Sequence, residues 1–248
     1  MTPFLRLVAA LAAVAFAGAC TAPAPEGAPV VVTPISVEEP GPGIDLEAQA
    51  RTFVATLAAL VPVASSECEA RVASGTDCDF RILIDDRPGM PPNAFQMRDE
   101  AGRPVIGITL ALIAEVGNAD ELAFIISHEA AHHILGHLDR QSRNAAIGAA
   151  ALGQLAQALG TTDPGTVRQL QELGAEVGAR SYSREFELEA DRLGTVIALR
   201  AGFDPLRGAA FFARIPDPGN RFLGTHPPNA ARVAVVRQVM AELARAGA

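Results

Sequence analysis

The chain has 248 residues and a formal net charge of −8; 49% of its residues are hydrophobic and 19% are charged. This hydrophobic content excludes an intrinsically disordered chain, and the length suits one domain of ordinary size. Nucleic-acid binding needs a basic face, so the acidic balance argues against a nucleic-acid partner.

The first residues have the pattern of an export signal. Arg6 precedes an apolar run from Leu7 to Ala19, which is shorter than the roughly 20 residues that span a bilayer. We therefore predict a signal peptide at residues 1–19. Small residues directly before Cys20 resemble a bacterial lipobox, which predicts that Cys20 is lipidated; cleavage to a soluble periplasmic protein is the alternative. Thr21, rather than Asp, follows Cys20, so the predicted address is the outer membrane, facing the periplasm.

The region after Cys20 predicts a tether and a disulfide-stabilised domain. Residues 20–43 are rich in proline, as in an extended spacer, and the folded domain is predicted at residues 44–248. Cys68 and Cys78 then remain as an even pair in an exported chain, where oxidising conditions favour a disulfide between them. Two free thiols are the alternative.

The domain begins with one predicted helix and two predicted strands. Asp45 is a suitable cap for a helix that presents one apolar face, made of Phe53, Val54, Leu57, Leu60 and Val61. Strands are predicted at residues 80–84 and 104–109, with turn signals between them.

From Ala119 onward the pattern is almost wholly helical. Asn118 and Glu121 have the spacing of a capping box, and the helix that they open is predicted to run to about Asp139. Further helices are predicted at residues 144–159, 166–179, 183–200, 204–214 and 229–244. The order of elements predicts a mostly helical α+β fold.

The segment from Asn144 to Leu159 is rich in alanine and has no charged residue. One interpretation is a buried helical hairpin with the next segment. The other is an exposed apolar flap near the membrane or near an active cleft. The first is the simpler and is preferred.

Four of the five histidines fall in the segment His128–His137, which begins with the pattern H-E-x-x-H. His128 and His132 are four residues apart on the predicted helix, so both rings can reach one tetrahedral ion. Glu129 lies one step round the helix, where it can take a proton from a metal-activated water. His133 and His137 lie off the direction of this pair and are interpreted as structural or surface residues.

A catalytic zinc needs a third protein ligand beside two histidines. The segment Ser183–Asp191 supplies three candidate glutamates, Glu185, Glu187 and Glu189. Asp191, four residues after Glu187, could accept the free ring N–H of a ligand histidine. The chemistry of these residues alone does not choose among the three glutamates.

The motifs H-E-A-A-H and S-R-E-F-E-L-E-A-D-R-L-G together resemble the HtpX and CAAX-prenyl-protease family of gluzincins, and in particular its exported lipoproteins of the BepA and LoiP type. The resemblance implies a zincin-like metallopeptidase whose small sheet has an edge strand facing the active cleft. It selects Glu187 as the third ligand of one Zn²⁺ and Asp191 as the partner of a ligand histidine.

Two further motifs carry the same resemblance. Asn93, Ala94 and Phe95 resemble the substrate-binding edge strand of the family. Thr225-His226-Pro227 resembles its S/T-H-P motif, which implies that His226 stabilises the oxyanion; His226 could also cover the metal in a resting state. Arg232 stands where that motif usually has an arginine.

These observations predict a zinc endopeptidase of the bacterial envelope. The family's transmembrane helices are missing from the pattern, so the expected substrates are misfolded or misassembled periplasmic and outer-membrane proteins. The expected membrane contact is the lipid anchor alone. The alternative is a zinc lipoprotein that acts as a chaperone or assembly scaffold without proteolysis.

Overall fold

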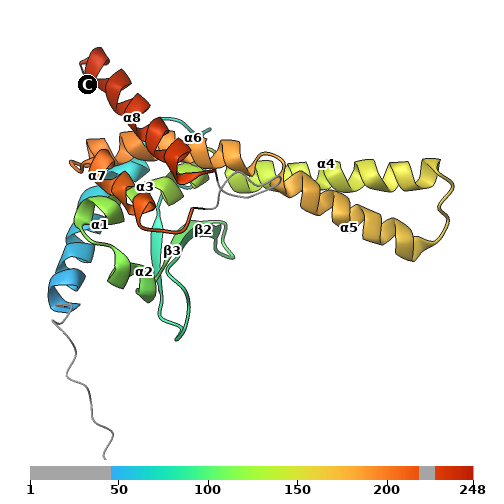
Figure 1. Ribbon diagram of the computed structural model, residues 1–248, viewed down its shortest axis with the longest axis horizontal. Helices are drawn as coiled ribbons and strands as arrows, with labels where there is room; N and C mark the ends of the chain where they lie inside the picture. The colour runs from blue at the N-terminus through green and yellow to red at the C-terminus, as the bar shows by residue number, and fades with distance from the viewer. Residues whose placement is uncertain (1–45, 218–226, 248) are drawn as a thin grey trace, which may run out of the picture. The chain divides into compact units, whose positions relative to one another are not determined.

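The computed structural model describes residues 46–217 and 227–247 (Figure 1). The chain divides into two units between Gly43 and Ile44, and every element described here belongs to the second unit. The predicted signal peptide, Cys20 and the tether lie outside the described residues, and so does His226.

The elements follow the mostly helical order that the sequence predicts. The helices and strands are α1 (Leu46–Glu69), β1 (Arg81–Asp85), β2 (Ala94–Arg98), β3 (Pro104–Thr109), α2 (Leu110–Glu115), α3 (Ala119–Ile134), α4 (His137–Ala158), α5 (Pro164–Arg180), α6 (Ser183–Arg200), α7 (Pro205–Ala209), the 3₁₀ helix η1 (Ala210–Ala213) and α8 (Asn229–Ala246). The α+β fold class is confirmed.

The three strands form one sheet in the order β1-β3-β2. The central strand β3 pairs in parallel with β1, with Ile82 opposite Ile106, and antiparallel with β2, with Phe95 opposite Gly107. Ile106 and Ile108 of β3 are buried in the core. Strand β2 therefore lies at an edge, and its second side has no partner strand among the described residues.

The core lies where α1, α3 and α6 meet the sheet, around fully buried side chains such as Leu60, Phe124 and Ile197. Among the described residues only α1 is long and apolar enough to cross a membrane, yet its Phe53, Leu60 and Ala64 pack into this core. The prediction for Val54 is wrong: it is 64% exposed, and Thr56 is buried on the inward face instead.

Helix α3 begins as predicted and ends earlier. The Asn118 side chain accepts hydrogen bonds from the backbone N–H groups of Asp120 and Glu121. The Glu121 carboxylate bonds to the N–H of Gly117, not of Asn118, and to Arg214. The predicted end near Asp139 is wrong, because Gly136 adopts the left-handed conformation (φ 64°) and closes α3.

Helices α4 and α5 form a hairpin that extends away from the remaining helices in Figure 1. Gly148 and Gly174 let the two backbones touch, because a Cβ on Gly148 would lie 2.0 Å from the Gly174 carbonyl oxygen. The predicted pairing with the next segment is thus present. The predicted burial is wrong: Ile147 is 67% and Leu159 76% exposed, because only one face of each helix is covered.

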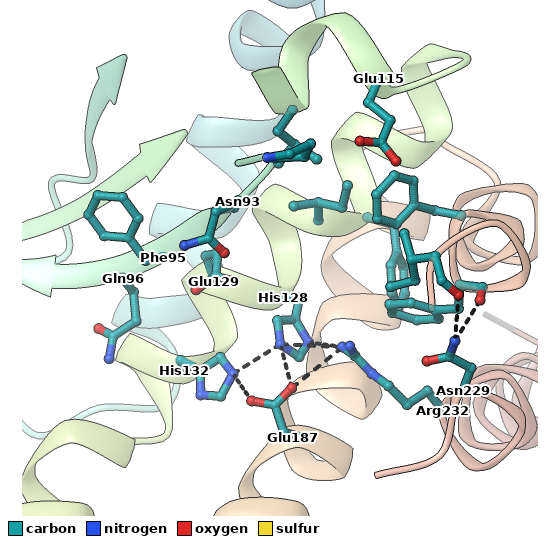
Figure 2. A pocket seen from close by; sticks show the side chains of 18 of the residues that line it. Asn93, Phe95, Gln96, Glu115, His128, Glu129, His132, Glu187, Asn229 and Arg232 are labelled. Atoms are coloured by element: carbon teal, nitrogen blue, oxygen red, sulfur yellow. Dashed lines mark hydrogen bonds and ion pairs between the residues drawn. The ribbon is translucent and has the colours of Figure 1, made fainter. Parts of the chain in front are cut away.

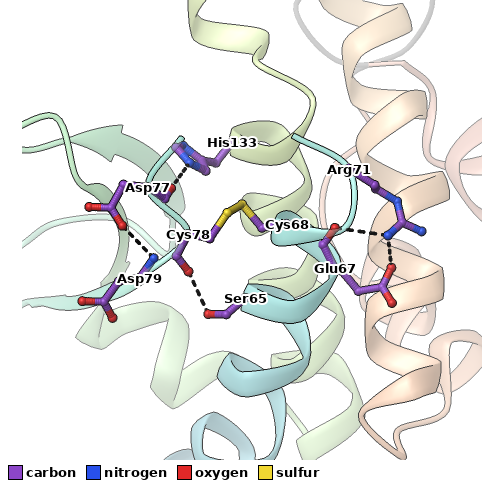
Figure 3. The surroundings of a disulfide bond; sticks show 8 residues. All are labelled: Ser65, Glu67, Cys68, Arg71, Asp77, Cys78, Asp79 and His133. Carbon is purple, nitrogen blue, oxygen red and sulfur yellow. Dashed lines mark hydrogen bonds and ion pairs between the residues drawn. A yellow bond between two sulfur atoms is a disulfide. The ribbon is translucent and has the colours of Figure 1, made fainter. Parts of the chain in front are cut away.

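The predicted disulfide joins Cys68, at the end of α1, to Cys78, just before β1 (Figure 3). Both half-cystines are buried, and Ser65 Oγ donates to the Cys78 carbonyl at 2.8 Å. His133 of α3 lies beside this loop, with Nε2 2.9 Å from the Asp77 carbonyl oxygen. The bridge therefore joins the end of α1 to the segment before β1, and α3 contacts the same loop through His133.

Replacing both cysteines by alanine should lower the free energy of unfolding by about 2–3 kcal/mol, since closing a short loop restricts the unfolded chain by roughly that amount. Urea unfolding of the oxidised protein and of the Cys68→Ala/Cys78→Ala variant measures the difference. A reductant should destabilise the parent and leave the variant unchanged. Equal midpoints for oxidised and reduced parent would contradict this role.

Candidate metal centre and cleft

Three side chains from two helices converge on one point (Figure 2). On α3, His128 Nε2 and His132 Nε2 are 3.0 Å apart; Glu187 of α6 places its carboxylate oxygens 3.5 Å and 3.4 Å from them. Ligand atoms bound tetrahedrally at about 2.0–2.1 Å lie about 3.3 Å from one another. These three residues, called the triad below, thus have the donor atoms and the spacing to hold a metal ion.

The close packing of α6 on α3 brings Glu187 to the histidines. Gly194 stands seven residues after Glu187 on the same face of α6, against the backbone of His128. A Cβ at Gly194 would lie 3.0 Å from the His128 nitrogen and 3.1 Å from its Cα. The absence of a side chain therefore sets how closely the third ligand approaches.

Asp191 and Arg232 orient His128 from behind. The Asp191 carboxylate lies 2.9 Å from His128 Nδ1, so the ring N–H on that atom donates to it and Nε2 faces the metal position. Arg232 of α8 donates to both Asp191 oxygens, at 2.8 Å from Nε and 2.6 Å from Nη2. The Arg232 guanidinium lies 3.9 Å from the centre of the Phe212 ring, and this contact holds Arg232 in place.

This buried arrangement keeps opposite charges paired. Burial, the largest influence, would raise the pKa of Asp191, but the hydrogen bonds from Arg232 and His128 hold it below its ordinary value. Burial and the charge of Arg232 lower the pKa of His128, and the carboxylates of Asp191 and Glu187 outweigh both, raising it to about 9 without metal. Without metal, the two carboxylates therefore favour a positive charge on His128.

The metal position opens into a cleft of about 640 Å³. One side is lined by the start of the edge strand, with Asn93, Ala94 and Phe95, and Glu129 of α3 also faces the cleft (Figure 2). No described residue of the α4–α5 hairpin lines it. The hairpin therefore does not cover the cleft in this structure.

The other side of the cleft is apolar, and we did not predict it from the sequence. Phe124 of α3, Phe211 and Phe212 of η1, and Ile215 line this side, and Asn229 holds the segment by donating to the carbonyls of Phe212 and Ile215. The one available signal was the adjacent pair Phe211-Phe212 in a chain with only 5% aromatic residues.

The remaining candidates separate clearly. Glu185 is exposed, and Glu189 contacts His137 and Arg140 instead of the triad. His133 is buried beside the disulfide loop, as expected of a structural residue. His226 lies outside the described residues, so its role stays a prediction.

The model of peptidase family M48 matches residues 70–240, which include the triad and the edge strand. The chain belongs to peptidase family M48. The resemblance seen in the motifs is confirmed, and His128, His132 and Glu187 form a group that could hold the metal ion of such a peptidase.

Curated relatives agree with this family. The chain is 32% identical over 139 residues to the beta-barrel assembly-enhancing protease of Escherichia coli O157:H7, and 31% identical over 139 residues to that of strain K12. It is 30% identical over 129 residues to a putative beta-barrel assembly-enhancing protease of Vibrio cholerae. The matches cover 50–51% of this chain but only 26–28% of the length of these relatives.

The contact at Gly194 leads to a prediction about metal binding. Gly194→Val should push α6 away from α3, destabilise the fold by about 1–3 kcal/mol and weaken metal binding, because Glu187 moves with α6. Thermal unfolding and a metal titration of the same samples measure the two effects. Gly194→Ala should show a smaller loss of both, and unchanged metal affinity in the valine variant would contradict the argument.

Proposed function

We propose that this metallopeptidase is a zinc-dependent endopeptidase of the bacterial cell envelope that degrades misfolded or misassembled periplasmic and outer-membrane proteins. The observation that carries the proposal is the convergence of His128, His132 and Glu187 in a cleft that is also lined by β2, a strand with no second partner strand among the described residues. A metal ligand set of this kind next to an extended-peptide site is what peptide hydrolysis requires.

Zinc is the metal that the ligand set favours. Two imidazoles and one carboxylate are the ligands of many catalytic zinc sites, and they leave a fourth position open. The spacings of 3.0–3.5 Å fit the bond lengths of zinc, and two imidazole nitrogens disfavour calcium, which takes oxygen ligands. Zinc bound here would supply a Lewis acid that polarises the scissile carbonyl and lowers the pKa of a water molecule.

The side chains around the metal position have distinct proposed roles. Glu129 takes the proton from the attacking water and returns it to the leaving amine. Asp191, held by Arg232, keeps the proton of His128 on Nδ1. His226 is proposed, from its Thr-His-Pro motif, to donate a hydrogen bond to the developing oxyanion.

The edge strand supports a broad substrate range. A peptide that adds to β2 would bond through its backbone, and Asn93, Ala94 and Phe95 would set its distance from Glu129. Backbone pairing discriminates little between side chains, which suits unfolded substrates. The apolar side of the cleft, with Phe211 and Phe212, would take a hydrophobic side chain of such a peptide.

The envelope location rests on separate observations. The N-terminal pattern predicts a signal peptide followed by a lipidated Cys20, and the disulfide between Cys68 and Cys78 suits an oxidising compartment. The relatives that match are named as beta-barrel assembly-enhancing proteases. Together these favour a lipoprotein that faces the periplasm, is tethered by residues 20–43 and contacts the membrane through its lipid anchor alone. Its substrates would be proteins of the envelope.

The metal assignment predicts which side chains the ion needs. His128→Ala, His132→Ala and Glu187→Ala should each lose the single zinc ion, because two remaining ligands do not hold it. Metal analysis of purified protein measures the stoichiometry. Glu185→Ala is the matched control on the same helix, and it should keep one zinc per chain. Full zinc content in Glu187→Ala would show that another carboxylate is the third ligand.

The catalytic assignment predicts a separation of metal binding from turnover. Glu129→Gln should keep its zinc and cleave unfolded casein at least about a hundredfold more slowly, because glutamine cannot accept the proton. The casein rate and the zinc content are measured on the same preparation. A parent protein that binds zinc and cleaves nothing would instead favour a chaperone or scaffold.

A further inference from the structure

A second chain of polar contacts lies behind the other ligand histidine. His132 Nδ1 and His137 Nδ1 are 2.8 Å apart, and His137 Nε2 lies 3.1 Å from a carboxylate oxygen of Glu189. Arg140 pairs with the same carboxylate. Among the described residues, the ligand atoms that could hold a metal ion come from His128, His132 and Glu187, so His137 and Glu189 are not part of the candidate ligand set.

The break between α3 and α4 creates this contact. On a continuous helix, residues five apart point about 140° away from each other, at roughly 100° per residue. His137 would then face away from His132, as the sequence suggests. Gly136, with φ 64° and ψ 34°, turns the chain so that the first residue of α4 returns to His132.

The proton positions along the chain follow from the metal position. His132 presents Nε2 to the triad, so as a neutral ligand it carries its proton on Nδ1. That N–H donates to His137 Nδ1, which must therefore be the unprotonated nitrogen of His137. The proton of His137 is then on Nε2, where it donates to Glu189. Each ring nitrogen of His132 and His137 thus has one role, and the series of hydrogen bonds ends at the Glu189 carboxylate.

The surroundings hold His137 in this orientation. Its ring is buried and stacks on Phe186, with ring centres 4.6 Å apart and planes 12° apart. Arg140 lies over the same Phe186 ring, 4.2 Å from its centre, while it pairs with Glu189. Ring rotation would break both the stacking and the hydrogen bonds.

We propose that His137 and Glu189 are positioning residues for the metal ligand His132, fixing its tautomer and ring orientation as Asp191 and Arg232 do for His128. The inference rests on the proposed zinc site. The proposal also gives a role to Glu189, one of the three glutamates that the sequence offered as a third ligand. Glu189 would act on His132 through His137.

The test measures zinc affinity, by competition with a chromogenic chelator, and the thermal stability of the metal-free proteins. His137→Phe keeps a ring against Phe186 but has no acceptor for His132. Glu189→Leu removes the acceptor at a half-exposed position where folding tolerates the change. Both variants should bind zinc about 10- to 100-fold more weakly than the parent. His137→Gln, which can accept and donate, should recover part of the affinity, and Glu185→Leu should match the parent.

The outcomes distinguish a failure of the positioning role from a failure of the proposed zinc site. A parent that binds no zinc would overturn the zinc site itself. A parent that binds zinc, with His137→Phe and Glu189→Leu within twofold of its affinity, would reduce His137 to a packing residue. If His137→Phe does not fold, Glu189→Leu and Glu185→Leu decide, because both positions lie on α6 away from the core.

Discussion

The contact between α3 and α6 at Gly194 is the constraint on which the metal centre depends. The H-E-x-x-H motif places two imidazoles on one face of α3, but two imidazoles do not make a catalytic zinc site. The candidate for the third ligand, Glu187, is on another helix, 59 residues after His128. Glycine at position 194 allows that helix to pack closely on the backbone of His128, where a Cβ would lie only 3.0 Å from the backbone nitrogen. The distances of 3.5 Å and 3.4 Å from Glu187 to the two histidines thus depend on a backbone contact about two helical turns away, at Gly194.

Close approach also places charged groups in the interior, where they have to be compensated. Asp191 is fully buried, and an isolated carboxylate there would cost several kcal/mol or take up a proton. Arg232 and His128 prevent this by donating three hydrogen bonds to its two oxygens. Arg232 comes from α8, so the C-terminal helix is tied to the centre by charge as well as by packing. The orientation of His128 therefore depends on three separate helices, α3, α6 and α8.

Much of the fold and of the candidate site could be predicted from the sequence, because local residue patterns decide those features. The spacing of His128 and His132, the cap at Asn118 and the bounds of β3 and α6 all follow from residues within one or two turns. The choice of Glu187 over Glu185 and Glu189 did not follow from local chemistry. It depended on a family motif, and the structure explains it, because the three side chains point in different directions from α6.

The features that the sequence did not predict depend on distant partners or on one backbone torsion. Val54 fits an apolar stripe as well as Leu60 does, and only the position of the sheet and α3 decides that Thr56 is buried instead. The exposed hairpin of α4 and α5 has the alanine-rich composition of a buried helix. Its glycines serve the close contacts between the two helices, and its outer faces stay exposed. The apolar side of the cleft is assembled from α3 and the segment after α7, which no local pattern connects.

The left-handed Gly136 links two of these features. A helix that continued to Asp139 would turn His137 away from His132 and would carry α4 along the axis of α3. The break does two things at once: it redirects α4 into the projecting hairpin, and it returns His137 to the back of His132. The contacts behind both histidines therefore lead to a carboxylate. His128 contacts the buried Asp191, which pairs with Arg232, and His132 contacts the half-exposed Glu189 through His137, with Arg140 paired to Glu189. Because His137 is the first residue of α4, the direction of the hairpin and the orientation of a metal ligand are set by the same backbone torsion.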